Sequence, residues 1–390
     1  MDKRVYFLMI VSFVVGMVEL IIGGLLDLIA IDLHVSLGQV GLLITIFSFI
    51  FAIASPILLI LTANIERKKL TLISLLIFLL GNIITVFSPT YSILFAGRVI
   101  SALSGALLII LCLTIAPTIV DHKYRGRAIG IVSMGVSASL VLGVPIGLTL
   151  GNAFGWRAPF VLITVLTILS IAGVYLLMER VEPIPSIPIG KQLATLKDRK
   201  ILFAQATTFL FIAGHTTLYA YLTPYLKTVL GLEGNWVSII YLIFGIAAVS
   251  GGGIGGTFAD LFGTKRTILS SIVIFAVAIF TIPYTTSILA VFLFVLVIWG
   301  MMSWAISPAM QSYLIEASPE TSAIQQSLNN SSLHLGIAIG SLIGGAVIEQ
   351  ASIEHNVTVG GLLVIISLGT ALVSMYENQS ITKKMNKSRI

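Results

Sequence analysis

The residues of this sequence that could do chemistry are few, and the first is an acidic side chain inside a long apolar run. Glu19 lies near the middle of residues 5–31, and Asp27 lies toward the end of the same run. A charged side chain at the centre of a bilayer costs a few kcal/mol or more, and acidic residues in such positions commonly mark proton pathways. We therefore predict that Glu19 takes up and releases a proton. The alternative is a structural glutamate that hydrogen-bonds across helices.

Two further residues are candidates for proton coupling. Arg98 lies within the apolar run 92–119, and because a guanidinium group stays charged, Arg98 cannot itself carry the proton. It could pair with a carboxylate, or it could bind backbone carbonyls of a neighbouring helix. His215 could share the proton because histidine titrates near physiological pH; the alternative is a neutral, hydrogen-bonded histidine.

Three apolar runs in the second half carry aromatic, amide and imidazole groups at helical spacing. Side chains four residues apart share a helix face. A flat heteroaromatic ligand needs rings to stack on, worth about 1–3 kcal/mol per base in nucleic-acid sites, and polar groups that pair with its edge. We predict a substrate pocket; the alternative is that these groups hold helices together. The predicted substrate-binding residues are Phe211, His215, Tyr219, Trp304, Gln311, Gln326, Asn330 and His334.

Composition indicates the environment of these residues. Of 390 residues, 57% are hydrophobic and only 10% are charged, whereas a soluble domain has about 25% charged residues. Apolar runs of about 20 residues can cross a bilayer as helices, and the alternation typical of a β-barrel is absent. We expect an all-α polytopic membrane protein with twelve transmembrane helices. The runs are 5–31, 39–62, 70–88, 92–119, 126–149, 157–178, 201–224, 235–258, 267–284, 288–316, 323–349 and 357–377.

The placement of basic residues predicts the topology. Nearly all of the 22 lysines and arginines fall in the N-terminal segment, in alternate loops and in the tail, and the positive-inside rule places these segments in the cytoplasm. Both termini are therefore expected to be cytoplasmic. This distribution accounts for the net charge of +6 without nucleic-acid binding. The single cysteine excludes an intramolecular disulfide.

A polar, proline-containing stretch divides the chain into two halves. We predict an N-terminal six-helix bundle over 1–178, a cytoplasmic linker over 179–200, a C-terminal six-helix bundle over 201–378 and a basic tail over 379–390. Residues 59–69 after the second run and 256–266 after the eighth run end in similar basic clusters. Two halves repeated in parallel orientation are typical of transporters that bind substrate between the halves.

The second of these loops is similar to the G-x-x-x-D-x-x-G-x-K-R signature of the major facilitator superfamily. Its matching residues, for which the resemblance implies a gating or structural role, are Gly256, Asp260, Gly263, Lys265 and Arg266. The first loop keeps basic residues, including Arg67, but has Ala63 in place of the aspartate and Leu59 and Glu66 in place of the glycines.

Another motif narrows the resemblance. Gly143, Pro145 and Gly147 resemble the glycine–proline motif of the drug:proton antiporter group, in which these residues have a structural or gating role. Arg98, followed by Gly105, looks like the motif of the fourth span in that group.

Several longer stretches resemble the bacterial purine base/nucleoside efflux pumps. The resemblance implies a proton-coupled antiporter in the bacterial cell membrane that exports purine bases, nucleosides and analogues by alternating access. Its implied partners are a purine-like small molecule, protons and the lipid bilayer. The stretches are 16–24, 127–131, 213–221, 299–304 and 311–316.

Other function classes remain as alternatives. A multidrug or arabinose-like sugar efflux antiporter is the nearest, and a passive channel is more remote. We expect no enzyme, catalytic residue, metal or cofactor, because paired catalytic groups and a phosphate-binding loop for ATP are missing from the sequence. We also expect a monomer.

Overall fold

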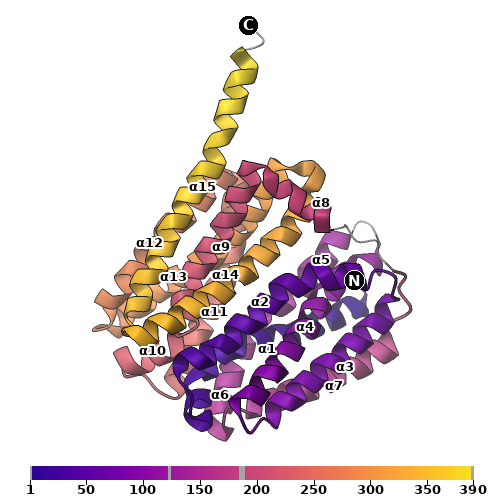
Figure 1. The fold of residues 1–390 in the computed structure, drawn as a ribbon, viewed down its shortest axis with the longest axis vertical. Helices are drawn as coiled ribbons and strands as arrows, with labels where there is room; N and C mark the ends of the chain where they lie inside the picture. Colours follow the sequence, from indigo (N-terminus) through magenta and orange to yellow (C-terminus); the bar gives the residue numbers. More distant parts are fainter. Residues whose placement is uncertain (1, 122–123, 184–188, 388–390) are drawn as a thin grey trace. The chain divides into compact units, whose positions relative to one another are not determined.

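The computed structural model describes residues 2–121, 124–183 and 189–387, and these residues form helices joined by short connections (Figure 1). Twelve helical spans in the described part of the chain are long and apolar enough to cross a membrane, which confirms the expected all-α polytopic fold. The elements are α1 Lys3–Leu33, α2 Leu37–Leu61, α3 Arg67–Val86, α4 Tyr91–Ile115, α5 Arg125–Ala138, a π-helical turn Ser139–Gly143, α6 Val144–Phe154, α7 Ala158–Leu177, α8 Ile189–Ala194, α9 Arg199–Tyr219, α10 Leu222–Val229, α11 Asn235–Phe262, α12 Thr264–Thr281, α13 Leu289–Ala317, α14 Ser322–Gln350 and α15 His355–Lys387.

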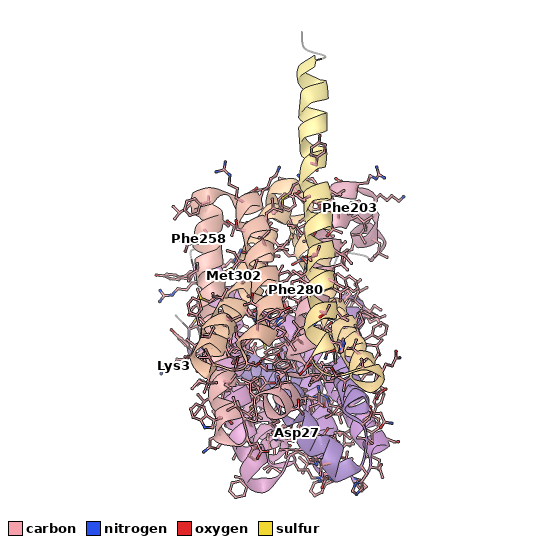
Figure 2. The ribbon with its side chains drawn as sticks, turned by 90° about the vertical axis from the view of Figure 1, so that its left-hand side faces the viewer. Lys3, Asp27, Phe203, Phe258, Phe280 and Met302 are labelled. Atoms are coloured by element: carbon pink, nitrogen blue, oxygen red, sulfur yellow. The ribbon has the colours of Figure 1, made fainter. Side chains whose placement is uncertain are left out.

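The outer side chains of the helices are apolar, as expected for contact with lipid. Phe258 and Leu261 on α11, for example, are largely exposed, and side chains of this kind project from the ribbon in Figure 2. Exposed apolar surface on this scale would be unfavourable in water. It is favourable only where hydrocarbon replaces water.

The chain forms two compact units. Unit 1 comprises Met1–Ser186 and Ala220–Gly245, and unit 2 comprises Ile187–Tyr219 and Ile246–Ile390. In unit 1, α3 packs against α4 and α7, and α1 packs against α5; in unit 2, α9 packs against both α14 and α15. The chain therefore crosses between units in the predicted linker, again after Tyr219, and again within α11.

Corresponding helices in the two halves start at an almost constant interval. Helices α3, α5 and α7 begin at Arg67, Arg125 and Ala158, and their counterparts α12, α14 and α15 begin at Thr264, Ser322 and His355. The repeat that was recognised in one pair of loops therefore extends over both halves, as in transporters with parallel repeats.

The seventh apolar run is not the single helix over 201–224 that its sequence predicts. Helix α9 ends at Tyr219, and α10 begins at Leu222. Pro224 explains the break, because in a continuous helix its ring would clash with the carbonyl of Ala220 four residues earlier. In the first turn of a new helix, proline is tolerated.

Helix α5, the π-helical turn and α6 pack closely against α1, and glycines lie at the points of contact. A Cβ atom at Gly143 or Gly147 would meet Met17 or Ile21 on α1, and a Cβ at Gly135 would overlap the carbonyl oxygen of Met9. Between these glycines, the backbone N–H of Val144 bonds to the carbonyl of Ser139, which makes a π-helical turn directly before Pro145. Small residues let membrane helices approach backbone to backbone.

This packing makes a stability prediction with a matched control on the same helix. Gly135→Ala should destabilise the protein by about 1–3 kcal/mol, because the new methyl group has no space beside Met9. Gly130→Ala should be neutral or slightly stabilising, because nothing lies within 4 Å of that position and alanine favours a helix. Thermal unfolding in detergent measures both, and equal melting temperatures would contradict the packing.

Candidate functional site

The acidic residue at the centre of α1 lies beside a buried arginine from α4. Arg98 is completely buried. Its Nη1 donates a hydrogen bond to the carbonyl oxygen of Val18 at 2.8 Å, and its Cζ lies 4.2 Å from the ring centroid of Phe47. The charge of Arg98 also interacts with Glu19. One guanidinium therefore binds a backbone carbonyl of α1 and interacts through its charge with the carboxylate of Glu19.

Arg98 has hydrogen-bonding capacity to spare. Among the described residues, its Nε and Nη2 have no hydrogen-bond partner. A buried donor without a partner is unfavourable by about 1–3 kcal/mol, and more when it is charged. The guanidinium thus has two unused donors in the interior of unit 1, near Glu19.

In unit 2, three of the predicted substrate residues form an aromatic cluster. His215 stacks on Tyr219 with ring centroids 5.0 Å apart, and Phe211 packs against Phe275 at 4.7 Å. Trp299 meets the imidazole edge-on at 5.7 Å. Phe275 and Trp299 were not predicted as site residues, although Trp299 lies in the stretch 299–304 on which the resemblance rests.

The imidazole of His215 is tied to the indole of Trp299. Trp299 Nε1 donates to His215 Nδ1 at 3.1 Å, and both side chains are buried. An imidazole that accepts at Nδ1 carries its proton on Nε2 and is neutral. Protonation of Nδ1 would break this hydrogen bond, so the geometry favours a neutral histidine over the proton-coupling role.

A polar network joins α9 to α14 in the same unit. Gln205 Nε2 donates to the backbone carbonyl of Gln325 at 3.1 Å. Asn329 Nδ2 donates to Gln205 Oε1 at 3.2 Å and to Thr208 Oγ1 at 2.7 Å. The orientations of the amides follow from this pattern of donors and acceptors. Polar contacts that hold helices together were the alternative to a substrate pocket. Such contacts are present here, but residues other than the predicted ones make them.

The predicted amides lie one residue away from this network. Gln326 and Asn330 are exposed, whereas their neighbours Gln325 and Asn329 are buried. The sequence contains both residues of each kind in succession, and the two sets have the same spacing of four. Periodicity therefore could not tell which set faces α9; only the packing of α14 decides it.

The other predicted binding residues lie on α13 and α14 and differ in exposure. Trp304 is half-buried on another side of α13 from Trp299, because five residues exceed one helical turn. Gln311 is exposed, and its Nε2 lies 3.4 Å from Ser307 Oγ of the same helix. His334 on α14 is buried.

The two repeated loops use different chemistry at the same position. Gly263 begins α12 with a φ of 87° that favours glycine, and Asp260 and Arg266 near it are exposed. In the first loop Glu66 begins α3 instead. The buried Arg67 donates from Nη1 and Nη2 to carbonyls at the end of α2 at 3.3 Å.

Glu66 binds three backbone amides. Partial burial opposes the charge of its carboxylate, but hydrogen bonds from the N–H groups of Val181, Lys69 and Lys68 outweigh burial and hold the pKa of Glu66 below its usual value. Arg67 in turn donates its N–H to the carbonyl of Val181 at 3.0 Å. The segment after α7 is thereby attached to the loop between α2 and α3. This contact was not predicted from the sequence, because the partners at Val181 are main-chain groups.

The comparisons with known proteins define the class. The fold and the paired halves are those of a polytopic transporter, and the chain matches the family model for the Major Facilitator Superfamily over residues 8–341 and 206–388. The protein belongs to this superfamily.

Relatives along the whole chain carry transporter names. The chain is 35% identical to the uncharacterized MFS-type transporter YbcL of Bacillus subtilis (strain 168), over 95% of both chains. It is 28% identical to a probable sugar efflux transporter of Mannheimia succiniciproducens, over 94% of this chain and 92% of the other. A bacterial homologue of the human lysosomal transporter Spinster, solved in an inward-facing, occupied conformation, has the same fold at 17% identity. Its TM-score is 0.82, with 96% of each chain covered.

The neighbouring amides of α14 allow a test with matched variants. Asn329→Ala should destabilise the protein by about 1–3 kcal/mol, because Gln205 and Thr208 lose a buried partner. Asn330→Ala should leave stability nearly unchanged, because its side chain is exposed. Thermal unfolding separates the two, and the reverse order would show that α14 is rotated from the arrangement described.

The carboxylate of Glu66 makes a pH-dependent contribution to stability. Because its pKa is lowered in the folded protein, the contribution is present above the usual glutamate value of about 4.3 and is lost as pH falls through the lowered value. Glu66→Gln should therefore lower the melting temperature at pH 7, by the equivalent of about 1 kcal/mol for a lost cap. The difference in melting temperature between the two proteins should disappear in acid. A difference that does not depend on pH would contradict the role of the ionised carboxylate.

Proposed function

We propose that this transporter is a proton-coupled antiporter that exports purine bases, nucleosides and analogues by alternating access. The observation that carries the proposal is the juxtaposition of Glu19 on α1 with the buried Arg98, which has two unused donors. The guanidinium offers a partner for the ionised carboxylate. Proton uptake by Glu19 would remove that attraction.

The loss of this attraction when Glu19 is protonated would couple proton movement to substrate transport. A membrane potential contributes about 2.3 kcal/mol per charge per 100 mV, so a proton that enters through Glu19 can drive export of a neutral solute. With the termini in the cytoplasm of a bacterial cell, as the basic loops favour, the proton would load from outside and leave inside. Arg98 keeps its charge throughout and positions the site.

The aromatic cluster supports a flat heteroaromatic substrate. Tyr219 is half-buried and stacks on His215, and the other four members of the cluster are buried, so Tyr219 is its most exposed member. A purine ring would stack there, and exposed amides such as Gln326 and Asn330 would pair with polar atoms on a substrate. We retain Trp304, Gln311 and His334 as further contacts to be tested.

Sugar efflux is the second candidate. The observation in its favour is the name of the Mannheimia succiniciproducens relative, a probable sugar efflux transporter. A sugar would pair its hydroxyl groups with the exposed amides. Direct binding of adenosine, hypoxanthine and guanosine, compared with arabinose and cationic dyes, distinguishes the candidates.

The coupling role has its own test in proteoliposomes. Wild-type protein should drive adenosine movement against its gradient, by about tenfold for each pH unit if one proton exchanges for one substrate. Glu19→Gln should still bind adenosine but should not respond to the imposed pH gradient. Asp32→Asn is the matched control, because Asp32 is an acidic residue of the same helix that pairs with Arg157. Unchanged coupling in Glu19→Gln would remove Glu19 from this role.

A further inference from the structure

The aromatic cluster of unit 2 contains a hydrogen bond that the proposed function leaves without a role. Trp299 on α13 is completely buried, and its Nε1 donates to Nδ1 of His215 on α9 at 3.1 Å. An indole N–H can only donate, so Nδ1 of the imidazole must accept and the ring proton lies on Nε2. The bond therefore selects one tautomer of His215 and determines which of its two nitrogens faces α13.

The oriented imidazole lies directly against the most exposed ring of the cluster. Tyr219 is the last residue of α9, and helical side chains lean back over the preceding turn, which here carries His215. The two rings stack with centroids 5.0 Å apart and planes 22° apart. Trp299 also meets the Tyr219 ring edge-on, with centroids 6.3 Å apart. The orientation of Tyr219 thus depends on a ring that Trp299 orients.

Backbone contacts hold α9 in place directly before His215. A Cβ atom at Gly340 of α14 would overlap the carbonyl oxygen of Ala213, and a Cβ atom at Gly360 of α15 would meet the carbonyl oxygen of Gly214. Helices that touch through backbone atoms have little room to rotate against each other. Packed helices, and not a loop, therefore set the position of the imidazole.

Helix α13 is held in the same way on the side away from Trp299. A Cβ atom at Gly251 of α11 would overlap the carbonyl oxygen of Met301. Residues two positions apart point in directions about 200° apart on a helix, so Trp299 lies nearly opposite the contact with α11 and faces α9. Both partners of the hydrogen bond are thus carried by helices whose rotation is restricted.

This arrangement orders Tyr219 before a ligand arrives. A side chain that becomes ordered only on binding lowers affinity, whereas one that is ordered beforehand does not. We propose that Trp299 is a positioning residue of the substrate site, which acts through His215 to hold the Tyr219 ring ready to stack on a flat heteroaromatic ligand. Because Trp299 is completely buried, it has this effect without touching the ligand. The inference rests on the proposed function.

The first experiment measures adenosine binding by calorimetry in detergent. Trp299→Phe keeps an aromatic ring but removes the N–H donor, and it should weaken binding by about tenfold. In a Tyr219→Leu background the same substitution should have no further effect, because a positioning residue acts only through the ring that it positions. Trp236→Phe, at an exposed position of α11, is the control and should not change binding. Unchanged affinity in Trp299→Phe, or an equal loss in the Tyr219→Leu background, would overturn the proposal.

The second experiment needs no substrate. NMR of isotopically labelled histidine rings should show His215 protonated at Nε2 alone in the wild-type protein, and as a mixture of tautomers in Trp299→Phe. The signal of His215 is the one that His215→Phe removes. A mixture of tautomers in the wild-type protein would overturn the proposal.

Two further outcomes are separated by the same variants. If Trp299→Phe does not fold, His215→Phe removes the same hydrogen bond from the other side while keeping a ring, and it should show the same loss of adenosine binding; full affinity in His215→Phe would overturn the proposal. If Trp299 controls the tautomer but the folded wild-type protein binds no purine, the proposed function fails, and the control of the imidazole by Trp299 stands.

Discussion

The dominant constraint on this protein is that hydrocarbon offers no hydrogen bonds. Every polar group inside the spans must find its partner within the protein, and the described polar side chains largely do so through neighbouring helices. Gln205, Thr208 and Asn329 pair with one another, and Trp299 pairs with His215. The buried polar atoms without a hydrogen-bond partner among the described residues include two donors of Arg98 and one oxygen of Asp27, both of which belong to charged side chains. Groups that leave hydrogen bonds unmade in such an environment are the natural places to look for exchange of partners.

The same constraint explains why the fold could be predicted and the site only in part. A helix in lipid needs an apolar run of known length, and such runs are visible in the sequence, so the twelve spans follow directly. Side-chain partners depend on the rotation of each helix about its axis. The helical period does not show whether Gln325 or Gln326 faces the neighbouring helix, and the same holds for Asn329 and Asn330. In the structure only Gln325 and Asn329 are buried.

The breaks in the helical backbone were not predicted from the sequence. Pro224 and Pro145 each lie at an irregular point, the gap between α9 and α10 and the π-helical turn before α6. Pro56 and Pro308, in contrast, lie inside continuous helices. A proline alone therefore does not determine where a membrane helix breaks, because neighbouring helices can satisfy the freed carbonyl. The tertiary environment decides whether the chain bends, breaks or continues.

The internal repeat shows how one fold can hold two kinds of site. With the interval that aligns the helix starts, Val18 corresponds to His215, and Ala102 corresponds to Trp299. In unit 1, α4 contacts α1 at Val18 through the guanidinium of Arg98. In unit 2, the corresponding helix α13 contacts α9 at His215 through an indole. The repeat thus preserves the place where two helices meet, while one half puts a permanent charge there and the other an aromatic cluster. In the proposed exchange of a proton for a flat neutral solute, the proton would therefore meet the charged groups of unit 1, and the solute would meet the aromatic cluster of unit 2.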